Sequence, residues 1–135
     1  MKYMLILIGE EGDEGDQSDT TPEELTESID RWSQYGKDLV DSGVFVASEA
    51  LQESPTAKTV HVGAGEDRLV TDGPFAETKE QLGGFYLLDC EDLDQALEWA
   101  KKVPLRPGGS IEIRPVMDYT EFGFEPAETR AEASS

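Results

Sequence analysis

The chain has 135 residues, and its 30 acidic and 11 basic residues give a formal net charge of −19 at pH 7. This length suits one domain with a sizeable core, and the charge repels nucleic acids and anionic lipid headgroups, so neither nucleic acid nor a membrane is an expected partner. One cysteine excludes an intrachain disulfide and the N-terminal apolar run is far too short to span a membrane, so we expect a cytoplasmic protein.

The first elements along the chain are a predicted strand and a predicted helix. Residues 2–8 form a near-continuous apolar run, which is typical of a strand covered on at least one face. An acidic, glycine-rich loop follows. Thr21 and Pro22 are residue types that favour the N-cap and the first turn of a helix, and Glu24 completes a capping box. The helix is expected to end near Ser42.

The apolar residues of this helix repeat at the helical period and should face a sheet: Leu25, Ile29, Trp32, Leu39 and Val40. Residues 44–51 predict a second strand. Two short strands, 59–62 and 68–71, surround the glycine-containing turn 63–65 and predict a hairpin. Residues 83–90 are again apolar and form the next expected strand.

The last predicted elements are a helix and a strand. Residues 92–95 have a capping-box pattern, and Pro104 ends the helix. Its apolar stripe consists of Leu93, Ala96, Leu97, Ala100 and Val103. Residues 110–116 alternate as a strand does. The periodicity then disappears, so we expect a domain over residues 1–117 and an acidic, flexible tail over 118–135.

The order of these elements predicts an α+β fold: a ferredoxin-like βαββαβ sheet with an inserted hairpin. Both helices should lie on one face of the sheet. Two helices leave the second apolar face open, and stacking the sheets of two copies would cover it. We therefore expect a homodimer.

The segment 71–89, TDGPFAETKEQLGGFYLLD, resembles the DGPF-domain group of the YCII-related proteins. The resemblance extends to MKYMLILI, EDLDQALEWA and SIEIRPV, and covers roughly residues 2–116. It implies a dimeric α/β barrel of ferredoxin-like protomers. The group's biochemical role is mostly unassigned, and its members are often encoded beside, or fused to, extracytoplasmic-function sigma factors, which makes a sigma factor a candidate partner.

The DGPF motif itself is the first candidate site. In a functional interpretation, Asp72 and Gly73 shape a rigid loop whose carboxylate faces a pocket, Phe75 forms an apolar wall, and Pro74 stiffens the loop. In a structural interpretation, the same residues make the turn that leaves a strand, because Asp accepts local hydrogen bonds and Gly allows a positive φ.

Other candidate residues carry a proton or a positive charge. The resemblance implies a catalytic His–Asp pair, in which the imidazole acts as base and the carboxylate orients it. The first helix lacks the expected histidine, and the only histidine, His61, would have to reach Asp72 across the hairpin. If the protein is an enzyme, Asp72 would act as acid or base, with His61 or Arg114 assisting. The alternative is an exposed strand histidine. Lys79 and Arg114 could bind an anionic substrate; alternatively, Lys79 balances neighbouring acids and Arg114 pairs with Glu112.

One histidine and one cysteine cannot build a usual zinc site, and residues 63–65 do not open a helix as a dinucleotide motif would, so we expect no metal and no cofactor. Two functions remain open, beside the plainer possibility of a stable dimer whose acidic tails only keep it soluble. One is a small-molecule-binding or enzymatic homodimer with a pocket near the DGPF loop, acting on a small organic acid or a ring compound. The other is a non-catalytic interaction protein that meets a sigma factor through its acidic surface.

Overall fold

The computed structural model describes residues 1–10, 21–76, 78 and 80–123. They form, in chain order, β1 (Lys2–Glu10), α1 (Pro22–Asp41), β2 (Phe45–Ala50), η3 (Ser54–Thr56), β3 (Lys58–Val62), β4 (Arg68–Asp72), β5 (Glu80–Asp89), α2 (Leu93–Lys101), β6 (Ser110–Pro115) and η4 (Tyr119–Phe122). Every predicted helix and strand is present. The turn η4 lies within the predicted tail, and residues 124–135 lie outside the described part of the chain.

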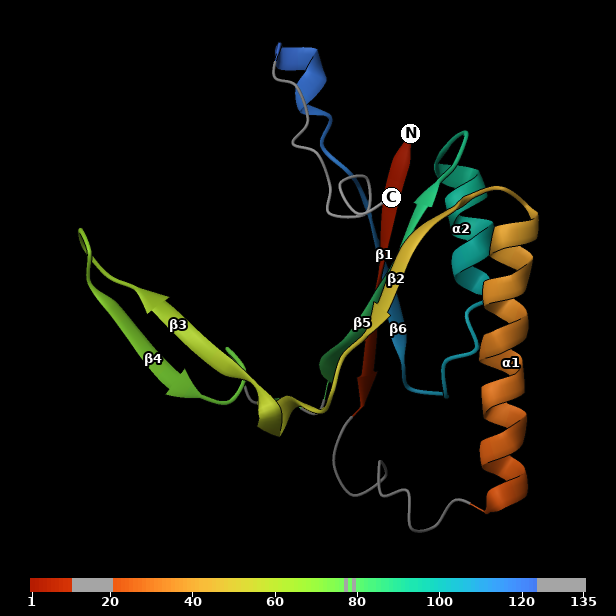
Figure 1. Cartoon of the computed structure of the whole chain (residues 1–135), viewed down its shortest axis with the longest axis horizontal. Coiled ribbons are helices and arrows are strands. Elements are labelled where there is room, and N and C mark those ends of the chain that lie inside the picture. Colours follow the sequence, from red (N-terminus) through yellow and green to blue (C-terminus); the bar gives the residue numbers. More distant parts are fainter. Residues whose placement is uncertain (11–20, 77, 79, 124–135) are drawn as a thin grey trace, which may run out of the picture.

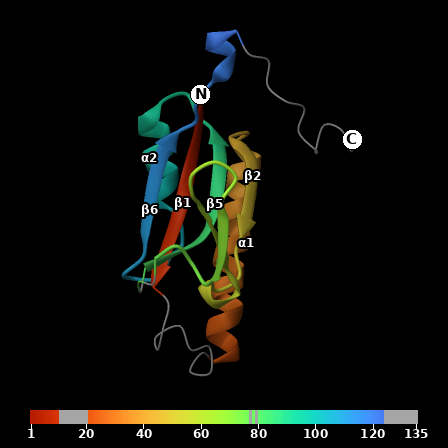
Figure 2. The ribbon, with the colours of Figure 1, turned by 90° about the vertical axis from the view of Figure 1, so that its left-hand side faces the viewer.

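Four antiparallel strands form one sheet in the order β2-β5-β1-β6, and β3 and β4 form a separate two-stranded hairpin. Figure 2 shows the four strands side by side, with the hairpin in front of the sheet and both helices behind it. This arrangement confirms the α+β, ferredoxin-like prediction and the inserted hairpin. No helix among the described residues is both long and apolar enough to cross a bilayer.

The core lies between the sheet and the two helices. Alternate residues of β1, namely Tyr3, Leu5 and Leu7, are buried on the helix side, whereas Met4 and Ile6 between them are half-buried on the other side. The most deeply buried large side chains in the described chain are Leu5, Leu39 and Leu88. Each such side chain stabilises the fold by about 1.5–3 kcal/mol relative to leaving it in water.

The two helix starts follow their predicted capping chemistry to different degrees. In α1, Thr21 accepts a hydrogen bond from the Glu24 amide, and the Glu24 side chain accepts one from the Thr21 amide, so the predicted capping box is complete. In α2, Asp92 accepts from the Gln95 amide, but the Gln95 side chain accepts from the amide of Glu91, one residue before the cap. Both arrangements satisfy amide groups that the helix itself leaves free.

The predicted stripe of α1 is only partly covered. Leu39 is buried, but Leu25 and Ile29 are about half exposed, at 49% and 55%. Figure 1 shows the reason: the first turns of α1 reach beyond the end of the sheet, so no strand lies beneath them. Tyr35, which the stripe did not include, is buried instead.

The β3–β4 hairpin projects from the sheet face that carries no helix, as Figures 1 and 2 both show. Its turn is closed by hydrogen bonds between Gly63 and Asp67 and between Asp67 and Ala64. Its large apolar side chains are 55–72% exposed: Val60, Val62, Leu69 and Val70. The hairpin is therefore held to the body chiefly through its base.

Candidate functional site

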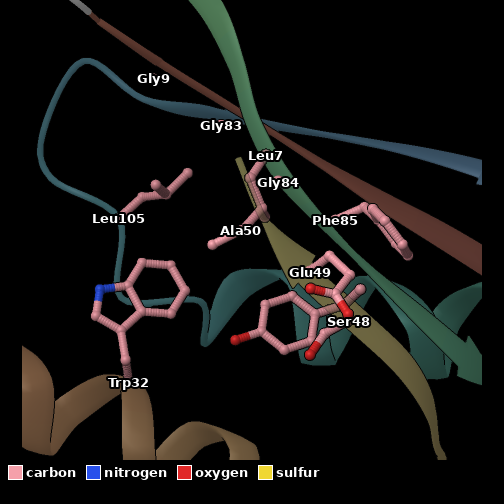
Figure 3. A pocket seen from close by; sticks show the side chains of 11 residues that line it. Leu7, Gly9, Trp32, Ser48, Glu49, Ala50, Gly83, Gly84, Phe85 and Leu105 are labelled. Carbon is pink, nitrogen blue, oxygen red and sulfur yellow. The ribbon is translucent and has the colours of Figure 1, made fainter. Parts of the chain in front are cut away.

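A pocket of about 420 Å³ lies between α1 and the helix-covered face of the sheet. Figure 3 shows Trp32 and Leu105 on one side and the strand residues Leu7, Gly84 and Ala50 across from them. Eleven residues line it: Leu7, Gly9, Trp32, Ser48, Glu49, Ala50, Gly83, Gly84, Phe85, Tyr86 and Leu105. The volume is within the range of about 300–1,000 Å³ that is usual for small-molecule sites.

The pocket exists because one row of side chains across the sheet is small. Leu7 of β1 pairs with Gly84 of β5, and Gly84 pairs with Ala50 of β2, so two of the three positions present little or no side chain toward α1. Gly84 is also required by close packing, since a Cβ there would lie 2.5 Å from the carbonyl oxygen of Glu49. The same glycine thus lets β2 approach β5 and leaves space beneath Trp32.

Aromatic rings form much of the wall. The Trp32 and Tyr86 rings are parallel to within 1°, with centroids 6.5 Å apart. Tyr35 meets Tyr86 edge to face at 5.2 Å and Trp99 at 6.2 Å. Its hydroxyl donates a 2.9 Å hydrogen bond to the Trp99 carbonyl oxygen, which fixes the Tyr35 ring against both neighbours.

Three residues that line the pocket have a polar side-chain atom with no hydrogen-bond partner among the described residues: Trp32 Nε1, Ser48 Oγ and Tyr86 Oη. None of these atoms is fully buried, because no buried side-chain nitrogen or oxygen in the described chain lacks a partner. The Tyr86 hydroxyl is a donor at neutral pH, and burial raises its pKa further above the ordinary value. No lysine or arginine lines the pocket. Glu49 pairs with Phe85, so strand alternation places its side chain on the opposite face from Ser48 and Tyr86.

The first residues of the DGPF motif lie at the base of the hairpin. Asp72 ends β4 and forms an exposed ion pair with Lys58 on β3. Gly73 has φ +94°, its amide donates to the Ala57 carbonyl at 2.8 Å, and its carbonyl accepts from Thr59 Oγ1 at 2.7 Å. The predicted turn chemistry is therefore present, and it closes the hairpin.

The structure does not bring His61 and Asp72 together. His61 pairs with Leu69, and Asp72 pairs with Lys58, which is an odd number of residues from His61 along β3. Alternation therefore places the two side chains on opposite faces of the hairpin. The nearest polar partner of His61 is Thr71, whose Oγ1 lies 3.0 Å from Nε2.

The remaining predicted ligand residues are dispersed. Pro74 is half-buried, whereas the Phe75 side chain is 87% exposed. Arg114 donates to Glu112 at 2.7 Å, which is the ion pair weighed as the alternative role. Lys79 lies outside the described residues. The pocket is lined by none of the described candidates, and in the described part of the chain no group of three or more His, Cys, Asp or Glu residues is placed to hold a metal.

Sequence reasoning missed the residues that do line the pocket. Trp32 was assigned to packing, and Ser48 and Tyr86 were ordinary strand positions. One local signal marks the pocket: glycines inside a strand often mark a bulge or a close approach of two backbones, and Gly83 and Gly84 are adjacent in β5. The β1–β5 register indeed shifts next to this pair, between Leu7 and Ile8.

Comparison with known proteins shows which sequences this chain resembles. An uncharacterised protein of Rhizobium meliloti (strain 1021) is 46% identical over 82 residues, which cover 59% of this chain and 65% of that relative. The match thus spans less than two thirds of the relative's own length. The sequence model of the YCII-related domain matches residues 1–120. The chain belongs to the YCII-related family.

Proposed function

We propose that this protein is a small-molecule-binding domain that works as a homodimer, with one ligand held between α1 and the sheet of each protomer. One observation carries this proposal: an apolar pocket of about 420 Å³ is lined by three residues whose polar side-chain atoms have no partner among the described residues. These atoms are open to solvent, because no buried side-chain nitrogen or oxygen in the described chain lacks a partner, so a ligand can hydrogen-bond to them in exchange for water.

The pocket between α1 and the sheet is not the pocket at the DGPF loop that the sequence led us to expect. Catalytic roles for Asp72 and His61 stay predictions, and so does the association with a sigma factor. Binding is the better supported role because Asp72 is engaged by Lys58, His61 contacts Thr71, and neither lines the pocket.

A fragment screen by thermal unfolding tests the binding role. Fragments that occupy the pocket should raise the unfolding midpoint of wild type, because a ligand at one hundred times its Kd adds about 2.7 kcal/mol to the folded state. Ala50→Leu should abolish the shifts, because it fills the pocket. Ala64→Leu, in the exposed hairpin turn, is the matched control and should keep them. Equal shifts in Ala50→Leu and wild type would place the binding elsewhere and refute the proposed site.

The homodimer is supported by two apolar surfaces that lie on the same side of the molecule. The open sheet face carries half-buried apolar side chains: Met4, Ile6, Ile8, Phe85 and Leu87. The hairpin extends beside it (Figure 1) and exposes Val60, Val62 and Val70. Two-stranded hairpins are marginally stable alone in water, so this one needs a surface to pack on. A second copy supplies both surfaces at once in a two-fold arrangement.

The molar mass in solution, measured by light scattering at several concentrations, tests the dimer. Val62→Glu places a charge on the hairpin where the side chain is 72% exposed within the protomer, so it should weaken the dimer without unfolding the chain. Ser33→Glu on the exposed side of α1 is the control. A monomeric wild type, or an unchanged dimer in Val62→Glu, would contradict this part of the proposal.

A further inference from the structure

We infer that the pocket selects an uncharged, flat aromatic ring that carries a hydroxyl group, and that it discriminates against organic acids of the same shape. This inference rests on the proposed ligand-binding role of the pocket and names its ligand class. It departs from the sequence-based expectation of an anionic substrate held by Lys79 or Arg114.

The preference for a flat ring follows from the aromatic wall. Trp32 and Tyr86 present ring faces with the same orientation, parallel to within 1°. Tyr35 supports Tyr86 from the side, at 87° and 5.2 Å between centroids, so the Tyr86 ring cannot turn freely. A planar ligand can stack on these faces, whereas a puckered ring of equal size cannot lie flat against them.

The preference for an uncharged ligand follows from the side chains that line the pocket. None is basic, and Arg114 forms an ion pair with Glu112. These two residues of β6 pair with Met4 and Ile6, whose side chains lie on the open face of the sheet. A carboxylate that entered would lose hydration without gaining a cation. The formal net charge of −19 adds a long-range repulsion of anions. A cationic amine would gain little from Glu49 either, because the Glu49 side chain points to the open face of the sheet and not into the pocket.

The hydroxyl requirement follows from Tyr86. Its own hydroxyl has no partner among the described residues, and it can both donate and accept a hydrogen bond. A tyrosine hydroxyl is protonated at neutral pH, and burial raises the pKa of Tyr86 further, so this group offers a proton to a ligand oxygen.

Calorimetric titration at pH 7 with four probes of matched size tests this inference. 2-Naphthol is flat, neutral and hydroxylated; naphthalene lacks the hydroxyl, 2-naphthoate is an anion, and decalin-2-ol is not flat. We expect 2-naphthol to bind wild type at least about tenfold more tightly than 2-naphthoate or decalin-2-ol. Tyr86→Phe should reduce the affinity for 2-naphthol several-fold and leave that for naphthalene unchanged. Tyr119→Phe, at an exposed tyrosine that does not line the pocket, is the control.

The outcomes separate this inference from the proposed function. Equal affinities for 2-naphthol and 2-naphthoate in wild type would overturn the ligand class and leave the binding role standing. An equal loss of naphthalene and 2-naphthol binding in Tyr86→Phe would overturn the hydroxyl contact. If none of the four probes binds and the fragment screen also finds nothing, both the inference and the proposed function fail. The comparison of probes on wild type stands even if Tyr86→Phe does not fold.

Discussion

Replacing Gly84 with alanine adds one methyl group where β2 passes β5. The new Cβ would lie 2.5 Å from the Glu49 carbonyl oxygen and 3.2 Å from Ala50 Cα, and these backbone atoms cannot rotate away as a side chain would. To reach 3.4 Å, where ordinary contact begins, the atoms must separate by about 0.9 Å. Because β2 pairs only with β5 in the sheet, the strain falls on this single pairing.

Overpacking of this kind costs about 1–3 kcal/mol. In a domain of this size each kcal/mol lowers the unfolding midpoint by about 3–5 °C, so Gly84→Ala should lower it by roughly 3–15 °C. Calorimetric unfolding measures this shift. The protein concentration must be held fixed, because dimerisation makes the midpoint depend on concentration.

Gly83→Ala is the matched control. It changes the neighbouring residue in the same way, but the nearest atom to its Cβ is the Leu7 carbonyl oxygen at 3.9 Å, an ordinary contact. Its midpoint should stay within about 2 °C of wild type. Equal shifts for the two variants, or none for Gly84→Ala, would refute the claim that Gly84 is required for the approach of β2 to β5.

Three further predictions concern other parts of the fold. Gly73→Ala should lower stability by about 1–2 kcal/mol in chemical denaturation, because φ is +94°, whereas Gly36→Ala inside α1 should be neutral or stabilising. Burial, followed by the charge of a neighbouring carboxylate, raises the pKa of Cys90, so a thiol reagent at pH 8 should label the native protein far more slowly than the unfolded chain, and equally fast labelling would contradict this. Burial raises the pKa of Tyr35 and Tyr86 above 10.0, so both hydroxyls ionise at a lower pH in the unfolded chain than in the folded protein. The free energy of unfolding should therefore stay constant below about pH 10 and decrease above it. The decrease should be less steep in Tyr35→Phe.

The order and type of the elements could be predicted because each signal is local. A capping box at Thr21 and Glu24 and the near-continuous apolar run of residues 2–8 depend on residues close to one another in the chain. The depth of burial depends on what lies opposite, and the sequence does not state it. Leu25 and Ile29 share the helical stripe of Leu39, yet only Leu39 has the sheet beneath it.

The candidate site was harder to predict because the conspicuous motif serves the hairpin. Asp72 and Gly73 have the residue types of a functional loop, but their polar groups are engaged by Lys58, Ala57 and Thr59. A site is distinguished by polar groups that the fold leaves without partners, and a sequence does not show which groups these are. The missing side chain at Gly84 was the one local sign of the pocket.

Alternation along β5 separates the two parts of the proposed function. Tyr86 faces the pocket, and its neighbours Phe85 and Leu87 pair with Ile6 and Met4 on the open face where a second copy is proposed to sit. A change at Tyr86 should therefore alter ligand affinity and leave the molar mass of the dimer unchanged, and a change at Leu87 should do the reverse. The opposite result would be a weaker dimer in Tyr86→Phe, or weaker ligand binding in the remaining dimer of Leu87→Ala. The pocket and the dimer surface would then be coupled through β5. By linkage, ligand binding would change the free energy of dimerisation by the same amount as dimerisation changes the free energy of ligand binding.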